Sequence, residues 1–185
     1  MVIGIAEKVA TVQQRLQQLQ AYTPAAQRFA TKLLGCAASA ADVCQSSLEK
    51  ALTTSHFPSD AAVLKSWFFQ VVRHQCLDHL RRNAQAKFND AEPTDLDGEA
   101  GYANQTIHPD QQLQQQQIAI VMRRALAQLP LAHAEILWLR EVHEFSYQQI
   151  ATIIAVEAGT VMSRIHRARL ALRVQLLKII ALEDL

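Results

Sequence analysis

The residues with the clearest chemical signature lie near the end of the chain, where basic side chains follow one another without an intervening acid. No Asp or Glu occurs between Ala158 and Leu182. Five basic residues fall in this stretch: Arg164, Arg167, Arg169, Arg173 and Lys178. Arg forms paired hydrogen bonds with guanine, and Arg, Lys, Ser and Thr also bind phosphate oxygens. The stretch therefore indicates nucleic-acid binding, with an ordinary solvated basic helix face as the simpler alternative.

Apolar residues in the same stretch recur as they would on one face of a helix. The expected buried face consists of Val161, Ile165, Ala168 and Leu172. Four polar residues lie away from that face: Thr160, Ser163, Arg164 and Arg167. A recognition helix divides its surface in this way, because one side packs on its own domain and the other enters the DNA groove. We expect this helix to run from about Thr160 to Leu182.

A short helix and a tight turn precede the basic helix. Ser146 is followed three residues later by Gln149, which is the spacing of a capping box. This spacing predicts a helix that begins at Ser146 and ends near Ala155, before a turn that includes Gly159. A short helix, a turn and a long helix match a helix-turn-helix. Before it we expect an apolar helix over 132–142 and another whose polar start is the Gln-rich run 111–117.

The first 83 residues predict four further helices. The apolar spacing favours helices over 5–19, from Thr23 to Gly35, from Ser39 to about 52, and through 64–82, with a loop at 53–60. Thr23 and Ser39 are candidate capping residues, Pro24 suits a first helical position, and Gly35 suits a helix end.

Composition and charge divide the chain into three parts. Half of the 185 residues are apolar, which excludes full disorder, and only five Gly and five Pro disfavour a turn-rich β fold. The net charge is +4 over 1–83, −5 over 84–120 and +2 over 121–185. Residues 84–112 lack helical periodicity, so they predict an acidic, flexible linker. We therefore expect an all-α protein with two small helical domains, 1–83 and 113–185, the second a helix-turn-helix.

The chain shows no sign of catalysis, export or membrane insertion. It has no Gly-rich phosphate loop and no His-Glu-x-x-His motif, so we expect neither an enzyme nor a bound cofactor. Cys76 and His79 are too few ligands for zinc, and no metal site is expected. The odd number of cysteines, three, predicts reduced thiols in a cytoplasmic protein. No apolar run is long enough to span a bilayer.

The carboxyl-terminal part resembles region 4 of the extracytoplasmic-function (ECF) sigma factors. The resemblance runs through 115–178 and is most specific over 158–169, Ala-Gly-Thr-Val-Met-Ser-Arg-Ile-His-Arg-Ala-Arg. In that family region 4 binds the minus-thirty-five element of the promoter. The resemblance therefore implies a set of DNA-contacting residues: Thr160, Met162, Ser163, Arg164, His166, Arg167 and Arg169.

Residues 26–83 resemble region 2 of the same family less strongly. The segment 40–45 corresponds to the family's acidic polymerase-docking helix, which implies docking through Asp42 and Gln45. The segments 67–74 and 77–82 correspond to the helix that meets the minus-ten element. There the resemblance implies four contacts: Arg73, His74, Arg81 and Arg82.

Several positions depart from the family's pattern. Ala41 and Ser46 stand where the docking helix often has acids, which predicts weaker polymerase docking. His74 replaces a common Asn, so promoter preference is expected to change or to become pH-sensitive. Ala155 stands where a turn Gly is usual, and Met162 replaces a common Lys.

The resemblance implies a cytoplasmic sigma factor that binds core RNA polymerase and promoter DNA. It further implies control by an anti-sigma factor, with the protein a monomer when free or a 1:1 complex with that factor. Two alternatives remain open at this stage. One is a polymerase-independent helix-turn-helix regulator that binds duplex DNA as a dimer, and the other is a degenerate sigma factor that binds only a partner protein.

Overall fold

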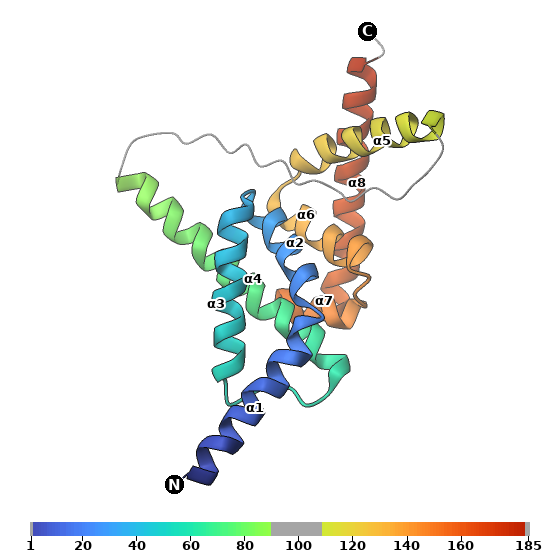
Figure 1. Cartoon of the computed structure of the whole chain (residues 1–185). Coiled ribbons are helices and arrows are strands. Elements are labelled where there is room, and N and C mark those ends of the chain that lie inside the picture. Colours follow the sequence, from blue (N-terminus) through green and yellow to red (C-terminus); the bar gives the residue numbers. More distant parts are fainter. Residues whose placement is uncertain (1, 90–108, 184–185) are drawn as a thin grey trace. The chain divides into compact units, whose positions relative to one another are not determined.

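The computed structural model describes residues 2–89 and 109–183, and every element in these ranges is helical (Figure 1). This confirms the predicted all-α class. The chain divides into two compact units, one of residues 1–100 with 151–155 and one of residues 101–150 with 156–185. Each unit is described by itself. Within the described residues, no helix combines the length and apolar character that a membrane-spanning helix requires.

Residues 2–89 of the first unit form four helices around an aromatic core. They are α1 (Val2–Gln20), α2 (Thr23–Leu34), α3 (Ala37–Thr53) and α4 (Ala61–Asn89). Helix α2 packs against both α3 and α4, and α3 packs against α4. Phe29 of α2 and Phe69 of α4 are fully buried, with ring centroids 5.5 Å apart. Burial of such side chains stabilises the fold by about 1.5–3 kcal/mol each.

Helix ends in this unit only partly follow the sequence prediction. Gly35 ends α2 with φ 70°, the left-handed conformation that glycine adopts without strain. The predicted caps at Thr23 and Ser39 are wrong. Helix α2 is preceded by Tyr22, and the Thr23 hydroxyl donates to the carbonyl of Leu19. Helix α3 starts at Ala37, two residues before Ser39.

Arg15 links α1 to the end of α3. Its Nη1 donates to the carbonyl oxygens of Leu52 and Thr54 at 3.0 and 2.9 Å. Its guanidinium also lies 4.8 Å from the ring centroid of Phe57. One side chain thus satisfies carbonyls at the carboxyl end of a helix and stacks on the loop that follows it.

The predicted linker boundaries differ from the observed helix ends. Helix α4 continues to Asn89 rather than ending at Arg82, and α5 (Pro109–Ala127) begins before residue 112. The Gln-rich run 111–117 lies in α5, as predicted. Residues 90–108, the centre of the predicted linker, lie outside the described residues.

The second unit surrounds the buried face of the last helix. It contains α5, α6 (Leu131–Leu137), a π-helical turn η1 (Trp138–Val142), α7 (Tyr147–Ile154, partly in the other unit) and α8 (Ala158–Glu183). Both α5 and α6 pack against α8. The single helix predicted over 132–142 is instead two elements, α6 and η1. In a π-turn the hydrogen bonds span one extra residue, and the His143 amide accordingly donates to the carbonyl of Trp138 at 3.1 Å.

Candidate nucleic-acid interface

The predicted capping box at the start of α7 is present. The Ser146 amide donates to Oε1 of Gln149 at 2.9 Å, and the Gln149 amide donates to Oγ of Ser146 at 3.2 Å. These reciprocal bonds satisfy two amides that the helix start leaves without intrahelical partners. They confirm the predicted start of the short helix.

The segment that leads into α7 is held by Arg140. Its Nη1 donates to the carbonyl of Phe145 at 2.9 Å, and its guanidinium lies 5.1 Å from the ring centroid of Tyr147. Phe145 is buried, and its amide donates to the carbonyl of Leu139. Glu144, which directly precedes Phe145, adopts φ 57°. A non-glycine residue holds this left-handed conformation only with support from its surroundings. Sequence reasoning missed this role of Arg140, because no local pattern marks a contact to a carbonyl five residues away.

The turn between α7 and α8 passes through Ala155. Its φ is 56°, so this alanine occupies the left-handed region. For an L-residue with a Cβ atom this conformation costs about 1–2 kcal/mol. The structure thus gives a physical reason why glycine suits this position better.

Helix α8 divides its first three turns as predicted. Val161, Ile165 and Ala168 are buried. The exposed side of the same turns carries four of the implied DNA contacts: Met162, Ser163, His166 and Arg167. Met162, the apolar member of this set, is 60% exposed. Thr160 and Arg164 are only half-buried, so they lie at the edge of this face and not at its centre.

Local hydrogen bonds arrange two of the exposed residues. The Ser163 hydroxyl donates to the carbonyl of Thr160 at 3.0 Å, and Nε of Arg167 donates to the carbonyl of Ser163 at 3.3 Å. This contact uses only Nε of Arg167 and does not engage the two Nη nitrogens of its guanidinium. We define Met162, Ser163, His166 and Arg167 as the reading face of α8.

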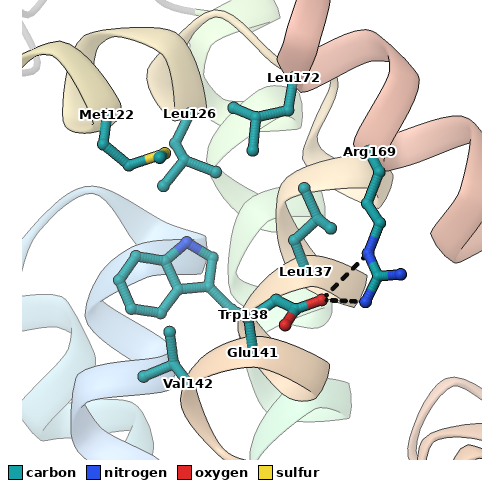
Figure 2. Close-up of a pocket in the computed structure, with 8 residues that line it drawn as sticks. All are labelled: Met122, Leu126, Leu137, Trp138, Glu141, Val142, Arg169 and Leu172. Atoms are coloured by element: carbon teal, nitrogen blue, oxygen red, sulfur yellow. Dashed lines mark hydrogen bonds and ion pairs between the residues drawn. The ribbon is translucent and has the colours of Figure 1, made fainter.

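Arg169 is engaged within the protein. Its Nε and Nη2 donate to Oε1 of Glu141 at 3.2 and 2.6 Å (Figure 2). The Glu141 carboxylate raises the pKa of Arg169 by hydrogen bonding and by charge. The pair borders an apolar cavity of about 430 Å³, whose lining includes Leu126, Trp138 and Leu172. A phosphate contact by Arg169 would therefore use donors other than these two or replace the Glu141 contact.

Three of the four implied minus-ten residues are exposed on the surface of α4. His74, Arg81 and Arg82 are exposed, whereas Arg73 is half-buried. Nη1 of Arg81 donates to Asp78 at 2.9 Å, and Nε of Arg82 donates to the Asp78 carbonyl. Asp78 thus partly neutralises the basic end of this helix, an effect that the count of charges alone did not reveal.

The implied docking residues lie on the outer surface of α3. Asp42 and Gln45 are exposed, and Nε2 of Gln45 donates to Oε1 of Glu49 at 3.3 Å. Glu49 follows Asp42 by seven residues, so both carboxylates lie on one helix face. The sequence analysis missed Glu49, although this spacing was the signal that could have found it.

The cysteines differ in burial. Cys44 and Cys76 are buried, whereas Cys36 is half-exposed at the start of α3. Burial raises the pKa of Cys44 to about 11. Hydrogen bonds from Ser39 and from the backbone of Ala38 lower the pKa of Cys36 below its usual value. Across the described residues, no three His, Cys, Asp or Glu side chains are grouped as metal ligands would be.

A helix-turn-helix whose long helix carries an exposed Arg, in one chain with a second helical unit, is typical of DNA-binding transcription factors of two parts. Comparison with known families identifies both parts. Residues 19–86 match the family described as Sigma-70 region 2, and residues 119–172 match Sigma-70, region 4. The chain belongs to the ECF sigma factors of the sigma-70 family.

Individual relatives agree with this assignment. The chain is 32% identical over 154 residues to the ECF RNA polymerase sigma factor SigL of Mycobacterium tuberculosis, covering 80% of this chain and 81% of SigL. It is 28% identical over 140 residues to the RNA polymerase sigma factor YlaC of Bacillus subtilis, covering 75% and 78% of the two chains.

Solved structures show the same fold. The sigma factor RpoE of Bartonella quintana, crystallised with the anti-sigma factor NepR, has a TM-score of 0.69 and 27% identity, covering 88% of this chain and 96% of RpoE. CnrH, in complex with the cytosolic domain of CnrY, has a TM-score of 0.59 at 19% identity, covering 92% and 93%. The alternative of a polymerase-independent regulator does not account for the match to region 2, because such a regulator would need only the helix-turn-helix.

Proposed function

We propose that this sigma factor reads the minus-thirty-five element with the reading face of α8. The observation that carries the proposal is the division of α8, in which Arg167 and Ser163 are exposed opposite a fully buried Val161. Arg167 supplies bidentate hydrogen bonds to a guanine, and Ser163 supplies a contact to a base edge or a phosphate. Thr160, Arg164 and Arg169 contribute at the margin of this face.

The first unit supplies the other two contacts of the proposal. His74, Arg81 and Arg82, with Arg73 at the margin, meet the minus-ten DNA, where opening the duplex costs a few kcal/mol per unstacked base. Asp42, Gln45 and, in addition, Glu49 dock the helix α3 on core RNA polymerase. The exposed carboxylates of Asp42 and Glu49 support this assignment, since they present negative charge on one helix face.

We propose domain boundaries near residues 83 and 113, with the acidic segment 84–112 between them. Because α4 continues to Asn89 and α5 begins at Pro109, the tether is the part of this segment between the two helices. The match to region 2 ends at residue 86 and the match to region 4 begins at residue 119, so most of this segment lies between the two matches, which supports the division. A tether raises the effective concentration of the second DNA contact once the first is made. We infer that the chain catalyses no reaction itself, because polymerase performs the chemistry, and that it acts in the cytoplasm.

We also propose that an anti-sigma factor sequesters this protein. The support is the structure of the similar RpoE, which was solved with NepR. Binding to both units would block the polymerase and the promoter contacts together. In this arrangement the protein is a monomer when free and forms a 1:1 complex with its anti-sigma factor.

Reconstituted transcription tests the main proposal. The protein is combined with bacterial core RNA polymerase, and run-off transcripts are collected from genomic promoter fragments. We expect transcripts that require the protein, and about a fivefold or greater loss with Arg167→Ala, since one bidentate base contact contributes about 1–3 kcal/mol. Arg164→Ala should cost less, because Arg164 is half-buried at the edge of the reading face.

The matched control is Arg28→Ala, which removes an exposed arginine of α2 that the proposal does not use. Equal losses with Arg28→Ala and Arg167→Ala would contradict the assignment of the reading face. A folded protein that neither binds core polymerase nor directs transcripts would overturn the proposal as a whole.

A further inference from the structure

The carboxyl-terminal half of α8 carries an apolar stripe on its outer side. The stripe consists of Leu170, Val174, Leu177 and Ala181, all exposed to solvent. The three large side chains are 49%, 50% and 58% exposed. The opposite side of the helix is the packed one, because Ala168 and Ile179 are buried there. We call the exposed set the outer stripe.

The spacing of the outer stripe is that of a coiled-coil seam. Successive members are four, three and four residues apart, which places them at alternating d and a positions of a heptad. Such a seam is completed by a second helix lying along it. Leu170 lies within the match to region 4, which ends at residue 172, whereas Val174, Leu177 and Ala181 lie beyond it.

Basic residues flank the seam on both sides. Arg173 immediately precedes Val174 and Lys178 immediately follows Leu177, so they occupy the g and e positions, and both are exposed. The two positions are five residues apart, which is the offset at which g and e side chains of parallel helices face each other. Two copies of α8 paired in parallel would therefore set Arg173 against Lys178 twice.

An antiparallel pair of α8 helices would supply no acidic partner either. In that orientation g faces g and e faces e. Depending on the register, Arg173 would meet Arg173 or Ile180, and Lys178 would meet Lys178 or Ala171. Like charges at these positions select against self-pairing, whereas acidic side chains opposite them favour pairing. No acid of α8 before Glu183 offsets these charges.

We propose that the outer stripe is a docking surface for an amphipathic helix of a partner protein. The partner helix carries aliphatic side chains at its a and d positions and Glu or Asp at its e and g positions. The aliphatic side chains cover Leu170, Val174 and Leu177, and the acids pair with Arg173 and Lys178. The inference does not depend on promoter recognition, since it uses a different part of α8.

Binding of designed peptides to the full-length protein tests this docking surface. The probe is a fluorescein-labelled peptide of about three heptads, with Leu at a and d and Glu at e and g, whose own acids keep it unpaired. Its counterpart has Lys in place of each Glu. Fluorescence anisotropy at low salt is expected to show at least about tenfold tighter binding of the acidic peptide.

Three variants make the test specific to the outer stripe. The double variant Val174→Ser, Leu177→Ser should lower the affinity for the acidic peptide about tenfold or more. The double variant Arg173→Glu, Lys178→Glu should reverse the preference, so that the basic peptide binds more tightly. Ile118→Ser, which changes an exposed apolar residue of α5, should leave both affinities unchanged.

Equal binding of the two peptides, or binding that survives the serine substitutions, would overturn the proposal. So would a dimer in sedimentation velocity that the serine substitutions dissociate, because the stripe would then serve a second copy of the chain. All substituted residues are exposed, and circular dichroism confirms that each variant is folded. The peptide measurement needs neither polymerase nor promoter, so its failure is distinct from failure of the transcription assay.

Discussion

Glu141 and Arg169 join the π-helical turn η1 to the middle of α8, although they are separated by 28 residues in the sequence. The guanidinium donates twice to one carboxylate oxygen (Figure 2). Both side chains are about half exposed, at 56% and 50%, so the pair resembles a surface ion pair and stabilises the fold by only about 0.2–1 kcal/mol. Its larger effect is to hold a cation that would otherwise be available to DNA phosphates.

Glu141→Gln is therefore expected to increase the affinity for promoter DNA. The substitution weakens the hold on Arg169, which gains about one phosphate contact and steepens the dependence of log Kd on log salt by about one unit. Titration of duplex DNA at several salt concentrations measures both effects. In the double variant Glu141→Gln, Arg169→Gln the additional slope should be lost.

The control for this experiment is Glu144→Gln, which removes the same charge from a nearby exposed residue. If it raises the salt slope as much as Glu141→Gln, the effect comes from the overall charge and the specific role of Arg169 is contradicted.

Ala155→Gly should stabilise the protein. Glycine adopts the observed φ of 56° without the steric cost that a Cβ atom imposes, so we expect a gain of about 1 kcal/mol and a melting temperature higher by about 3 °C. Ala119→Gly is the matched control in the middle of α5, where glycine should instead cost about 1 kcal/mol. Thermal denaturation followed by circular dichroism distinguishes the two, and a loss of stability with Ala155→Gly would contradict the left-handed turn.

Removal of the capping box should destabilise α7. Ser146→Ala deletes the acceptor for the Gln149 amide and is expected to cost about 1 kcal/mol in the free energy of unfolding. Ser46→Ala, within α3, removes only a bond to its own helix and should be neutral or slightly stabilising. Urea denaturation measures both, and equal effects would show that the cap adds nothing.

Alkylation should distinguish the cysteines. Because the pKa of Cys36 is lowered and its side chain is half-exposed, Cys36 should react first with iodoacetamide near pH 8. Cys44, whose pKa is raised from 9.0 to about 11, should remain protected until the protein unfolds. Peptide mass mapping over time measures the order. Labelling of Cys44 at the rate of Cys36 would contradict the packing of α3.

The same shift predicts a loss of stability in alkaline solution. Folding raises the pKa of Cys44, so the native state favours the protonated thiol. Its contribution to stability is complete below about pH 9 and is lost as the pH rises through about 11. In Cys44→Ala the free energy of unfolding should fall less steeply over this range, as pH-dependent urea denaturation would show.

Predictions from the sequence succeeded where the signal is local. The Ser146–Gln149 box and the end of α2 at Gly35 each depend on a few neighbouring residues, and both were found. Three of the four residues predicted for the buried face of α8 are buried, namely Val161, Ile165 and Ala168, because their helical spacing is a local signal. The fourth, Leu172, is only half-buried. The caps at Thr23 and Ser39 failed because a helix can begin earlier when neighbouring helices stabilise it, whatever the local preference.

Features that depend on contacts between distant residues were not predictable in this way. The pairing of Glu141 with Arg169, the hold of Arg140 on Phe145 and the contact of Arg15 with the end of α3 join separate elements. Helix periodicity also does not distinguish an α-helix from a π-turn, so η1 was interpreted as part of a longer α-helix. The resemblance supplied the set of site residues, and the structure showed which of them are exposed.

Helix α8 carries the reading face and the outer stripe on one uninterrupted rod. At 1.5 Å per residue, Ser163 and Leu177 are about 21 Å apart along its axis, roughly the width of the duplex that the reading face would meet. A helix docked on the stripe and a duplex on the reading face would thus approach the same rod from neighbouring positions. By thermodynamic reciprocity, any factor by which the docked helix lowers the affinity for DNA is also the factor by which bound DNA lowers the affinity for the helix. The promoter itself would then act as a releasing ligand.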